Sequence, residues 1–133
     1  MIPDFNEYGC LPEGIHATTL EEVALRFGTQ SELRRVQMES LRWLVELART
    51  AGVQRIILNG SFTTDTVEPN DVDCLLLIGP GFPRSSSAED ELRRGLPFLD
   101  IQLVELRDFV FYSETFYASD RLFEPKGMVE IVS

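Results

Sequence analysis

Three aspartates stand where the sequence predicts the beginnings and edges of buried strands. Asp71 and Asp73 are two residues apart at the start of an apolar run, so their side chains should share one face of a strand. Asp100 lies in the next expected strand, which should pack beside the first. Clustered carboxylates repel, because two unit charges about 4 Å apart cost roughly 4 kcal/mol at an effective dielectric near 20. A divalent cation would relieve this cost, and Mg²⁺ prefers carboxylate, phosphate and water ligands.

A polar, turn-rich segment precedes these aspartates. Gly60 permits a tight turn and a close approach of the backbone to a ligand. The hydroxyl of Ser61 and neighbouring N–H groups can bind phosphate oxygens, and Thr63 and Thr64 add further hydroxyl groups. Two metal ions held by carboxylates can bind the attacking and leaving oxygens of a phosphoryl displacement. Together these residues predict a metal-dependent site for a phosphorylated ligand.

Length and charge limit the partners that the chain can have. A chain of 133 residues with 44% hydrophobic residues suits one domain, residues 1–133, with its own core. The balance of 12 Lys and Arg against 22 Asp and Glu gives a formal charge of -10. Such a surface disfavours extended nucleic acid, whose binding depends on basic residues that displace counterions. A small nucleotide whose phosphates meet metal ions remains compatible, and so does a basic partner protein.

The cysteines and the apolar runs bear on the compartment. Cys10 and Cys74 do not make a disulfide framework, and Cys74 stands in an apolar run where a buried thiol is expected. The opening MIPDFNEYG lacks the basic and apolar regions of a signal peptide. The longest apolar run, CLLLI, is too short to span a bilayer. We therefore expect a soluble cytoplasmic protein without membrane contact.

Threonine–glutamate spacing predicts where the first helices begin. Thr19 stands three residues before a glutamate, which predicts a short helix that ends near Phe27. Thr29 has the same spacing and predicts an amphipathic helix of about 20 residues that ends at Gly52. The apolar stripe of this long helix is expected to comprise Leu33, Val36, Leu41, Leu44, Val45 and Ala48. Further helices are expected over 88–94 and 109–117.

Short apolar runs bounded by turn residues predict the strands. The run that begins after the Asp71–Asp73 pair is apolar enough to lie in the middle of a sheet. Residues 1–17 contain several glycines and prolines and are expected to be irregular but packed on the core. The expected strands cover 55–58, 72–78, 98–106 and 128–132.

The order Gly60-Ser61, Asp71-Val72-Asp73 and a later strand aspartate resembles the signature of the DNA polymerase β-type nucleotidyltransferases. This superfamily includes the minimal nucleotidyltransferases of toxin–antitoxin pairs and the aminoglycoside nucleotidyltransferases. The signature covers residues 55–105. The opening MIPDFNEYGCLPEGIH and the closing KGMVEI are similar to a small bacterial family of that superfamily, which extends the resemblance over nearly the whole chain.

The resemblance implies an α/β (α+β) domain in which helices flank a mixed sheet. It also implies a transferase that moves a nucleotidyl group, such as AMP, from a nucleoside triphosphate to a hydroxyl of a partner protein or small molecule. Asp71 and Asp73 would then bind two Mg²⁺ ions, with Mn²⁺ as an alternative. Asp100 would bind the catalytic ion and help to deprotonate the acceptor, while Gly60 and Ser61 would hold the triphosphate.

Two features keep a function of another class open. The loop over 62–70 contains Asp65 and Glu68 but no lysine or arginine, and Lys126 is the sole lysine of the chain. The chain after Glu105 is also too short for a separate acceptor-binding domain. An enzyme of this kind would need a partner protein, such as a toxin, or a homo-oligomer to complete it. The alternative is a binding module of the same fold that neutralises a partner by contact, as an antitoxin does.

Overall fold

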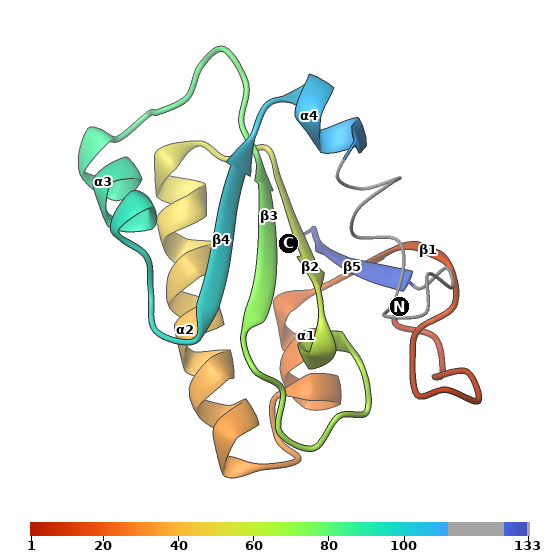
Figure 1. The fold of residues 1–133 in the computed structure, drawn as a ribbon. Helices are drawn as coiled ribbons and strands as arrows, with labels where there is room; N and C mark the ends of the chain where they lie inside the picture. Colours follow the sequence, from red (N-terminus) through yellow and green to blue (C-terminus); the bar gives the residue numbers. More distant parts are fainter. Residues whose placement is uncertain (112–126, 133) are drawn as a thin grey trace.

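Five strands form one mixed sheet in the order β1-β5-β2-β3-β4 (Figure 1). The structure is a computed structural model that describes residues 1–111 and 127–132. β3 and β4 are parallel, as are β1 and β5, whereas β2 runs antiparallel to both β5 and β3. The expected mixed sheet is therefore confirmed. The strands are β1 (Gly14–Thr18), β2 (Arg55–Asn59), β3 (Val72–Leu77), β4 (Leu99–Val104) and β5 (Gly127–Ile131).

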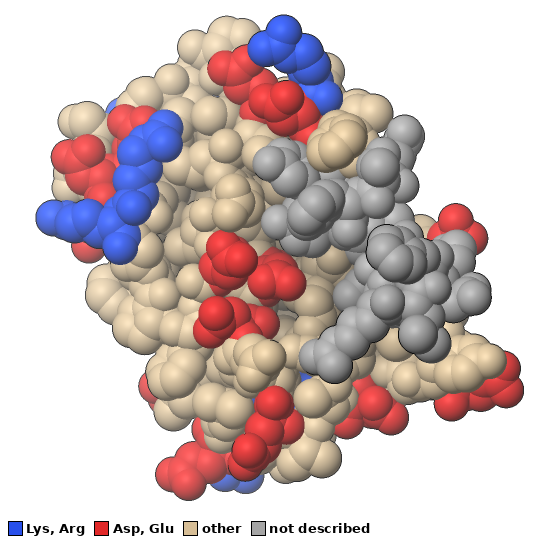
Figure 2. Space-filling model, viewed as in Figure 1, with Lys and Arg blue, Asp and Glu red and all other residues tan. Residues whose placement is uncertain are grey.

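Helices flank this sheet, which makes the fold an α+β domain. Figure 1 shows α1, α2 and α3 on one side of the sheet and α4 beside the end of β4. Figure 2, in the same view, shows acidic side chains gathered over the first halves of β3 and β4. No helix in the described ranges is long and apolar enough to cross a membrane. The helices are α1 (Leu20–Phe27), α2 (Glu32–Ala51), α3 (Ser86–Arg94), α4 (Leu106–Phe111) and the short 3-10 turn η1 (Ser61–Thr63).

The helix ends follow the capping pattern, with one correction. The Thr19 hydroxyl accepts a hydrogen bond from the Glu22 N–H at 3.1 Å and caps α1, as predicted. α2 ends at Gly52, also as predicted, and the structure shows this glycine in the left-handed conformation. Its N-cap, however, is Ser31 rather than Thr29. Both serine and threonine can cap a helix. The helical conformation begins at Glu32, so Ser31 is the residue in the N-cap position.

The N-terminal segment departs from its prediction. Residues 14–18 form β1, which pairs in parallel with β5 from the other end of the chain. The expectation of an irregular segment over 1–17 is therefore wrong for its last four residues. The sequence GIHAT lacks a strong strand pattern, and its partner lies more than a hundred positions away. The helix expected over 109–117 begins earlier, at Leu106, and residues 112–117 lie outside the described residues.

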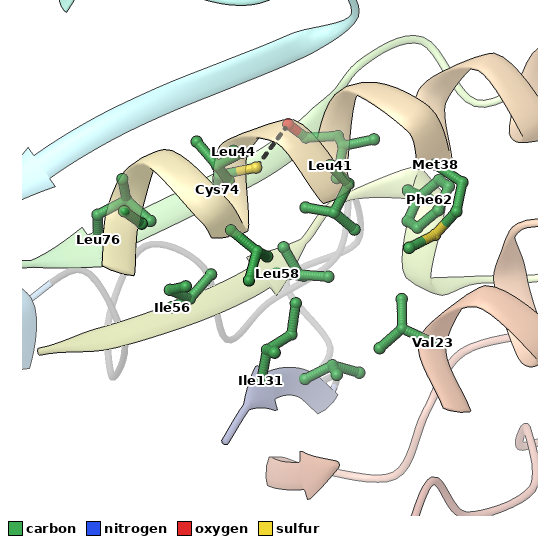
Figure 3. Packing of buried hydrophobic residues seen from close by; sticks show 14 of the residues in the cluster. Val23, Met38, Leu41, Leu44, Ile56, Leu58, Phe62, Cys74, Leu76 and Ile131 are labelled. Carbon is green, nitrogen blue, oxygen red and sulfur yellow. Dashed lines mark hydrogen bonds between the residues drawn. The ribbon is translucent and has the colours of Figure 1, made fainter. Parts of the chain in front are cut away.

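Two apolar clusters cover the two faces of the sheet. The larger one lies between the sheet and α1, α2 and α3, and Figure 3 shows its centre. Cys74 belongs to this cluster and is buried, as expected from its apolar run. The smaller cluster covers the opposite face and comprises Ile57, Leu75, Leu77, Val104, Phe109 and Met128. The β3 side chains next to Cys74 in the sequence, such as Leu75, therefore point away from α2.

The first turns of α2 bury polar side chains instead of the expected apolar stripe. Val36 is 36% exposed, whereas Arg34 is 2% and Gln37 is 0% exposed. The Gln37 amide nitrogen donates to the carbonyl oxygens of Pro69 at 2.9 Å and Asn70 at 3.0 Å. A helix face that meets an irregular loop must supply hydrogen-bond donors, because the buried carbonyl groups of the loop have no strand partner.

Arg34 supplies most of these donors. Its guanidinium donates to the carbonyl oxygens of Phe27 at 2.9 Å and Phe62 at 2.8 Å. It also donates to Thr64 at 2.8 Å and to Thr66 at 2.6 Å. Burial lowers the pKa of Arg34, while the Asp65 carboxylate opposes that change. The arginine remains charged, because its ordinary pKa is far above neutral, and it holds the loop that follows β2.

We expect Arg34→Ala to lower the free energy of unfolding by about 3 kcal/mol. A hydrogen bond to a charged group contributes about 1.5–3 kcal/mol, and each buried acceptor left without a donor adds a cost of its own. Arg35→Ala is the matched control, because Arg35 is exposed and makes one bond of 3.3 Å to Thr29. Urea titration followed by Trp43 fluorescence measures both variants. Equal losses in the two variants would contradict the role given to Arg34.

Candidate functional site

A pocket of about 600 Å³ opens where the loop after β2 meets the beginning of β3. This volume lies within the range of roughly 300–1,000 Å³ found for small-molecule sites. Its wall combines the N-terminal segment, the Gly60-Ser61 turn and the residues just before β3. The described lining residues are Tyr8, Cys10, Gly60, Ser61, Thr64, Asp65, Thr66, Asn70, Asp71 and Asp73. Five of the seven predicted site residues therefore lie together on one surface, namely Gly60, Ser61, Thr64, Asp71 and Asp73.

Gly60 is required at its position for two reasons. Its backbone has φ 84° and ψ -164°, a conformation that residues with a Cβ rarely adopt. A Cβ added to Gly60 would also overlap the carboxylate of Asp73. The sequence predicted that this glycine allows a close approach of the backbone to a ligand, and that prediction stays untested. What the structure adds is the Asp73 side chain, which lies directly against the turn.

The hydroxyl residues of the turn divide into two groups. Neither the N–H nor the hydroxyl of Ser61 has a hydrogen-bond partner in the described part of the chain, so both can meet a ligand. The Thr64 hydroxyl donates to the Ser61 carbonyl at 2.7 Å and also lines the pocket. Thr63 is 2% exposed, and its hydroxyl bonds the Gly60 carbonyl at 3.1 Å. Thr63 therefore stabilises the turn from its buried side and is not among the described residues that line the pocket.

The predicted carboxylates come together in part. Asp73 and Asp100 are direct Cα partners on the parallel strands β3 and β4, so their side chains lie on the same face. Asp71 immediately precedes β3 and lines the pocket with Asp73. Asp100 is exposed, does not line the pocket, and accepts a 3.3 Å hydrogen bond from Gln102. Figure 2 shows acidic side chains gathered over this part of the sheet.

The carboxylates fit a magnesium ion that a ligand helps to hold. Among the described residues, no three His, Cys, Asp or Glu side chains are close enough together to form a metal site by themselves. Mg²⁺ does not need such a cage, because proteins usually bind it through one or two carboxylates, water and substrate phosphates. Asp71 and Asp73 offer oxygen ligands of this kind on the pocket wall. The donor set is therefore compatible with a metal–phosphate complex.

The acidic pair also affects the thiol beneath it. Burial raises the pKa of Cys74 well above its ordinary value, and the charges of Asp73 and Asp100 raise it further. The Cys74 thiol is buried on the helix-covered face and donates to the Val72 carbonyl (Figure 3). A thiol in this environment remains protonated and unreactive at neutral pH. Cys74 therefore acts as a core residue rather than as a nucleophile.

Several pocket residues were not predicted from the sequence. Asp65, Thr66 and Asn70 belong to the loop whose polarity was noted, and their place on the wall follows from the loop's path. Tyr8 and Cys10 come from the N-terminal segment, which reaches the pocket through a tertiary contact. No local pattern in that segment indicates such a contact.

Residues 3–132 match the model of DUF6932, a family of unknown function, and the chain belongs to this family. No curated protein and no solved structure matches the chain. The resemblance to the polymerase β-type nucleotidyltransferases thus stays a prediction. Function is therefore inferred from the chemistry of the pocket.

The contact between Gly60 and Asp73 can be tested against a glycine with nearly the same backbone conformation. Gly95 has φ 88° and ψ 163°, but a Cβ added there meets no atom within 4 Å. Gly95→Ala should cost about 1–3 kcal/mol of stability for the backbone alone. Gly60→Ala should cost at least about 1 kcal/mol more, because the new methyl group displaces the Asp73 carboxylate.

Urea denaturation of both variants measures the difference, and a double-mutant cycle with Asp73→Ala assigns it. The additional cost should disappear when Asp73 is already alanine. If Gly60→Ala lowers stability by the same amount when Asp73 is alanine, the Asp73 carboxylate is not what excludes a side chain at residue 60.

Proposed function

We propose that this protein is a metal-dependent nucleotidyltransferase that moves a nucleotidyl group, such as AMP, from a nucleoside triphosphate to a hydroxyl group. One observation carries the proposal: the Gly60-Ser61 turn, with an open Ser61 N–H and hydroxyl, lies directly against the Asp73 carboxylate in a ligand-sized pocket. The acceptor hydroxyl would belong to a partner protein or to a small molecule.

The residues would divide the work as follows. Ser61 would donate its N–H and hydroxyl to phosphate oxygens, and Asp71 and Asp73, which line the same pocket, would hold Mg²⁺. Bound metal supplies charge neutralisation for the phosphates and the leaving pyrophosphate. A new bond forms between the acceptor oxygen and the α-phosphorus while the bond from that phosphorus to the bridging oxygen breaks. Asp100 accepts the proton of the hydroxyl, and pyrophosphate leaves.

The charge of the pocket makes binding dependent on a cation. The described lining residues include Asp65, Asp71 and Asp73 but no lysine or arginine. A bare triphosphate would meet like charges, and their repulsion grows as water is excluded. The pocket should therefore bind a magnesium–nucleotide complex and reject the metal-free nucleotide.

The same acidity supports a second candidate function. Asp100 lies outside the pocket lining, and the described lining residues offer a triphosphate no cationic side chain. Both observations favour a binding module that contacts a basic partner, such as a toxin, through its acidic face. The nucleotidyltransferase must bind a nucleoside triphosphate, whereas the binding module need not bind any.

Calorimetry with the four nucleoside triphosphates and Mg²⁺ separates these candidates. The wild-type chain should bind at least one of them with Mg²⁺ and none in EDTA. Asp73→Asn should lower the affinity of the magnesium complex at least about tenfold, which corresponds to about 1.4 kcal/mol. Asp90→Asn is the matched control, because Asp90 is exposed on α3 and lies outside the pocket lining.

Whether Asp73→Asn weakens or strengthens nucleotide binding distinguishes two roles for this carboxylate. A carboxylate that only repels phosphate would, once neutralised, give stronger binding, including binding in EDTA. That result would contradict a metal-holding role for Asp73. Absence of binding to the wild-type chain, together with tight association with a basic partner, would favour the binding module.

Transfer itself requires a separate measurement. With an α-labelled nucleotide and a cell lysate as the acceptor source, label incorporation and pyrophosphate release should be equal in amount. Asp100→Asn should slow incorporation at least about a hundredfold at saturating nucleotide, as expected when a general base is removed. Asp108→Asn, an exposed change in α4, should leave the rate unchanged. Equal rates for the wild-type chain and Asp100→Asn would exclude Asp100 as the proton acceptor.

A further inference from the structure

We propose that Tyr8 is the stacking surface for the base of a purine nucleotide in this pocket. The inference rests on the proposed function and names the class of nucleotide that the site would select. Tyr8 stands on the pocket wall, and it is the sole aromatic side chain among the described lining residues. It is 72% exposed, although a tyrosine ring commonly buries much of its surface.

The turn that presents Tyr8 is held by its own hydrogen bonds. The Asn6 side-chain oxygen accepts from the N–H groups of Tyr8 at 2.9 Å and Cys10 at 3.1 Å. The Asn6 N–H donates to the Cys10 carbonyl at 2.7 Å. Gly9 supplies the positive φ of 74° that closes the turn. The backbone of Tyr8 is therefore fixed before any ligand arrives, which lowers the entropy cost of stacking.

The same turn is attached to the loop that forms the pocket. The Asp65 N–H donates to the Gly9 carbonyl at 3.0 Å, and a Cβ added to Gly9 would overlap the Asp65 carboxylate. Asp65 belongs to the loop whose carbonyl groups Arg34 holds. Tyr8 and Ser61 are thus positioned by one connected set of contacts, although they are far apart in the sequence.

The chemistry of the wall decides which ligand group meets Tyr8. Most of the other described lining residues carry a hydroxyl or a carboxylate group, and such groups suit phosphates with a cation rather than a planar base. A base that enters with its triphosphate would find a π surface at Tyr8. Stacking on an aromatic side chain contributes about 1–3 kcal/mol per base. Because purines present a larger ring face than pyrimidines, the structure points to a purine preference.

The experiment compares ligands with and without a base. Calorimetry with Mg²⁺ would use ATP, CTP and inorganic triphosphate, and the wild-type chain should bind ATP most tightly. Tyr8→Ala should weaken ATP about tenfold and CTP less, and it should leave inorganic triphosphate unchanged. Tyr8→Phe should stay within about twofold of the wild type, since the ring is retained. Trp43→Ala is the control, because Trp43 is half exposed on α2, away from the pocket lining.

The other outcomes separate this inference from the proposed function. If ATP binds and Tyr8→Ala changes nothing, the stacking role is overturned and the nucleotide site stands. The same holds if Tyr8→Ala weakens ATP and inorganic triphosphate equally, because the residue would then act on the fold of the pocket. If the wild-type chain binds none of the three ligands with Mg²⁺, both the inference and the proposed function are overturned.

Discussion

The buried guanidinium of Arg34 is the interaction on which the candidate site depends. It lies in the first turns of α2 and bonds carbonyl oxygens that span the end of α1 and the loop after β2. These bonds fix the side of the loop that follows the Gly60-Ser61 turn against the helix. Gln37, three residues further on, holds the Pro69–Asn70 backbone in the same way. One face of α2 therefore holds both ends of the loop between β2 and β3, and this loop leads directly into Asp71 and Asp73.

This arrangement explains why a basic residue is present near the site and yet does not line it. The donors of Arg34 are engaged by backbone carbonyl groups, and the side chain is 2% exposed. A phosphate could not recruit it without breaking several charged hydrogen bonds, each contributing about 1.5–3 kcal/mol. Arg34 therefore holds the loop from its buried side, and the described residues that line the pocket include no lysine or arginine.

Local patterns predict the parts of this structure that local chemistry determines. Strands β2, β3, β4 and β5 follow apolar runs, and Gly60, Ser61 and the aspartates near β3 could be selected by residue type and spacing. What the sequence did not reveal depends on contacts between distant segments. In the sequence, Arg34 looks like a solvated charge, because its loop partners are distant. The turn that carries Tyr8 reaches the loop through the contact between Gly9 and Asp65. The pairing of β1 with β5 has the same cause.

The in-register pair of Asp73 and Asp100 is the strongest physical reason to expect chemistry at this place. Like charges opposite each other on neighbouring strands destabilise a sheet. Asp100 forms no salt bridge with the described residues and accepts only a long hydrogen bond from Gln102. A protein that only binds a partner by charge could place its carboxylates apart at lower cost. The proposed metal–phosphate site would account for this like-charge pair beside a glycine turn, because a bound cation lowers the repulsion between carboxylates.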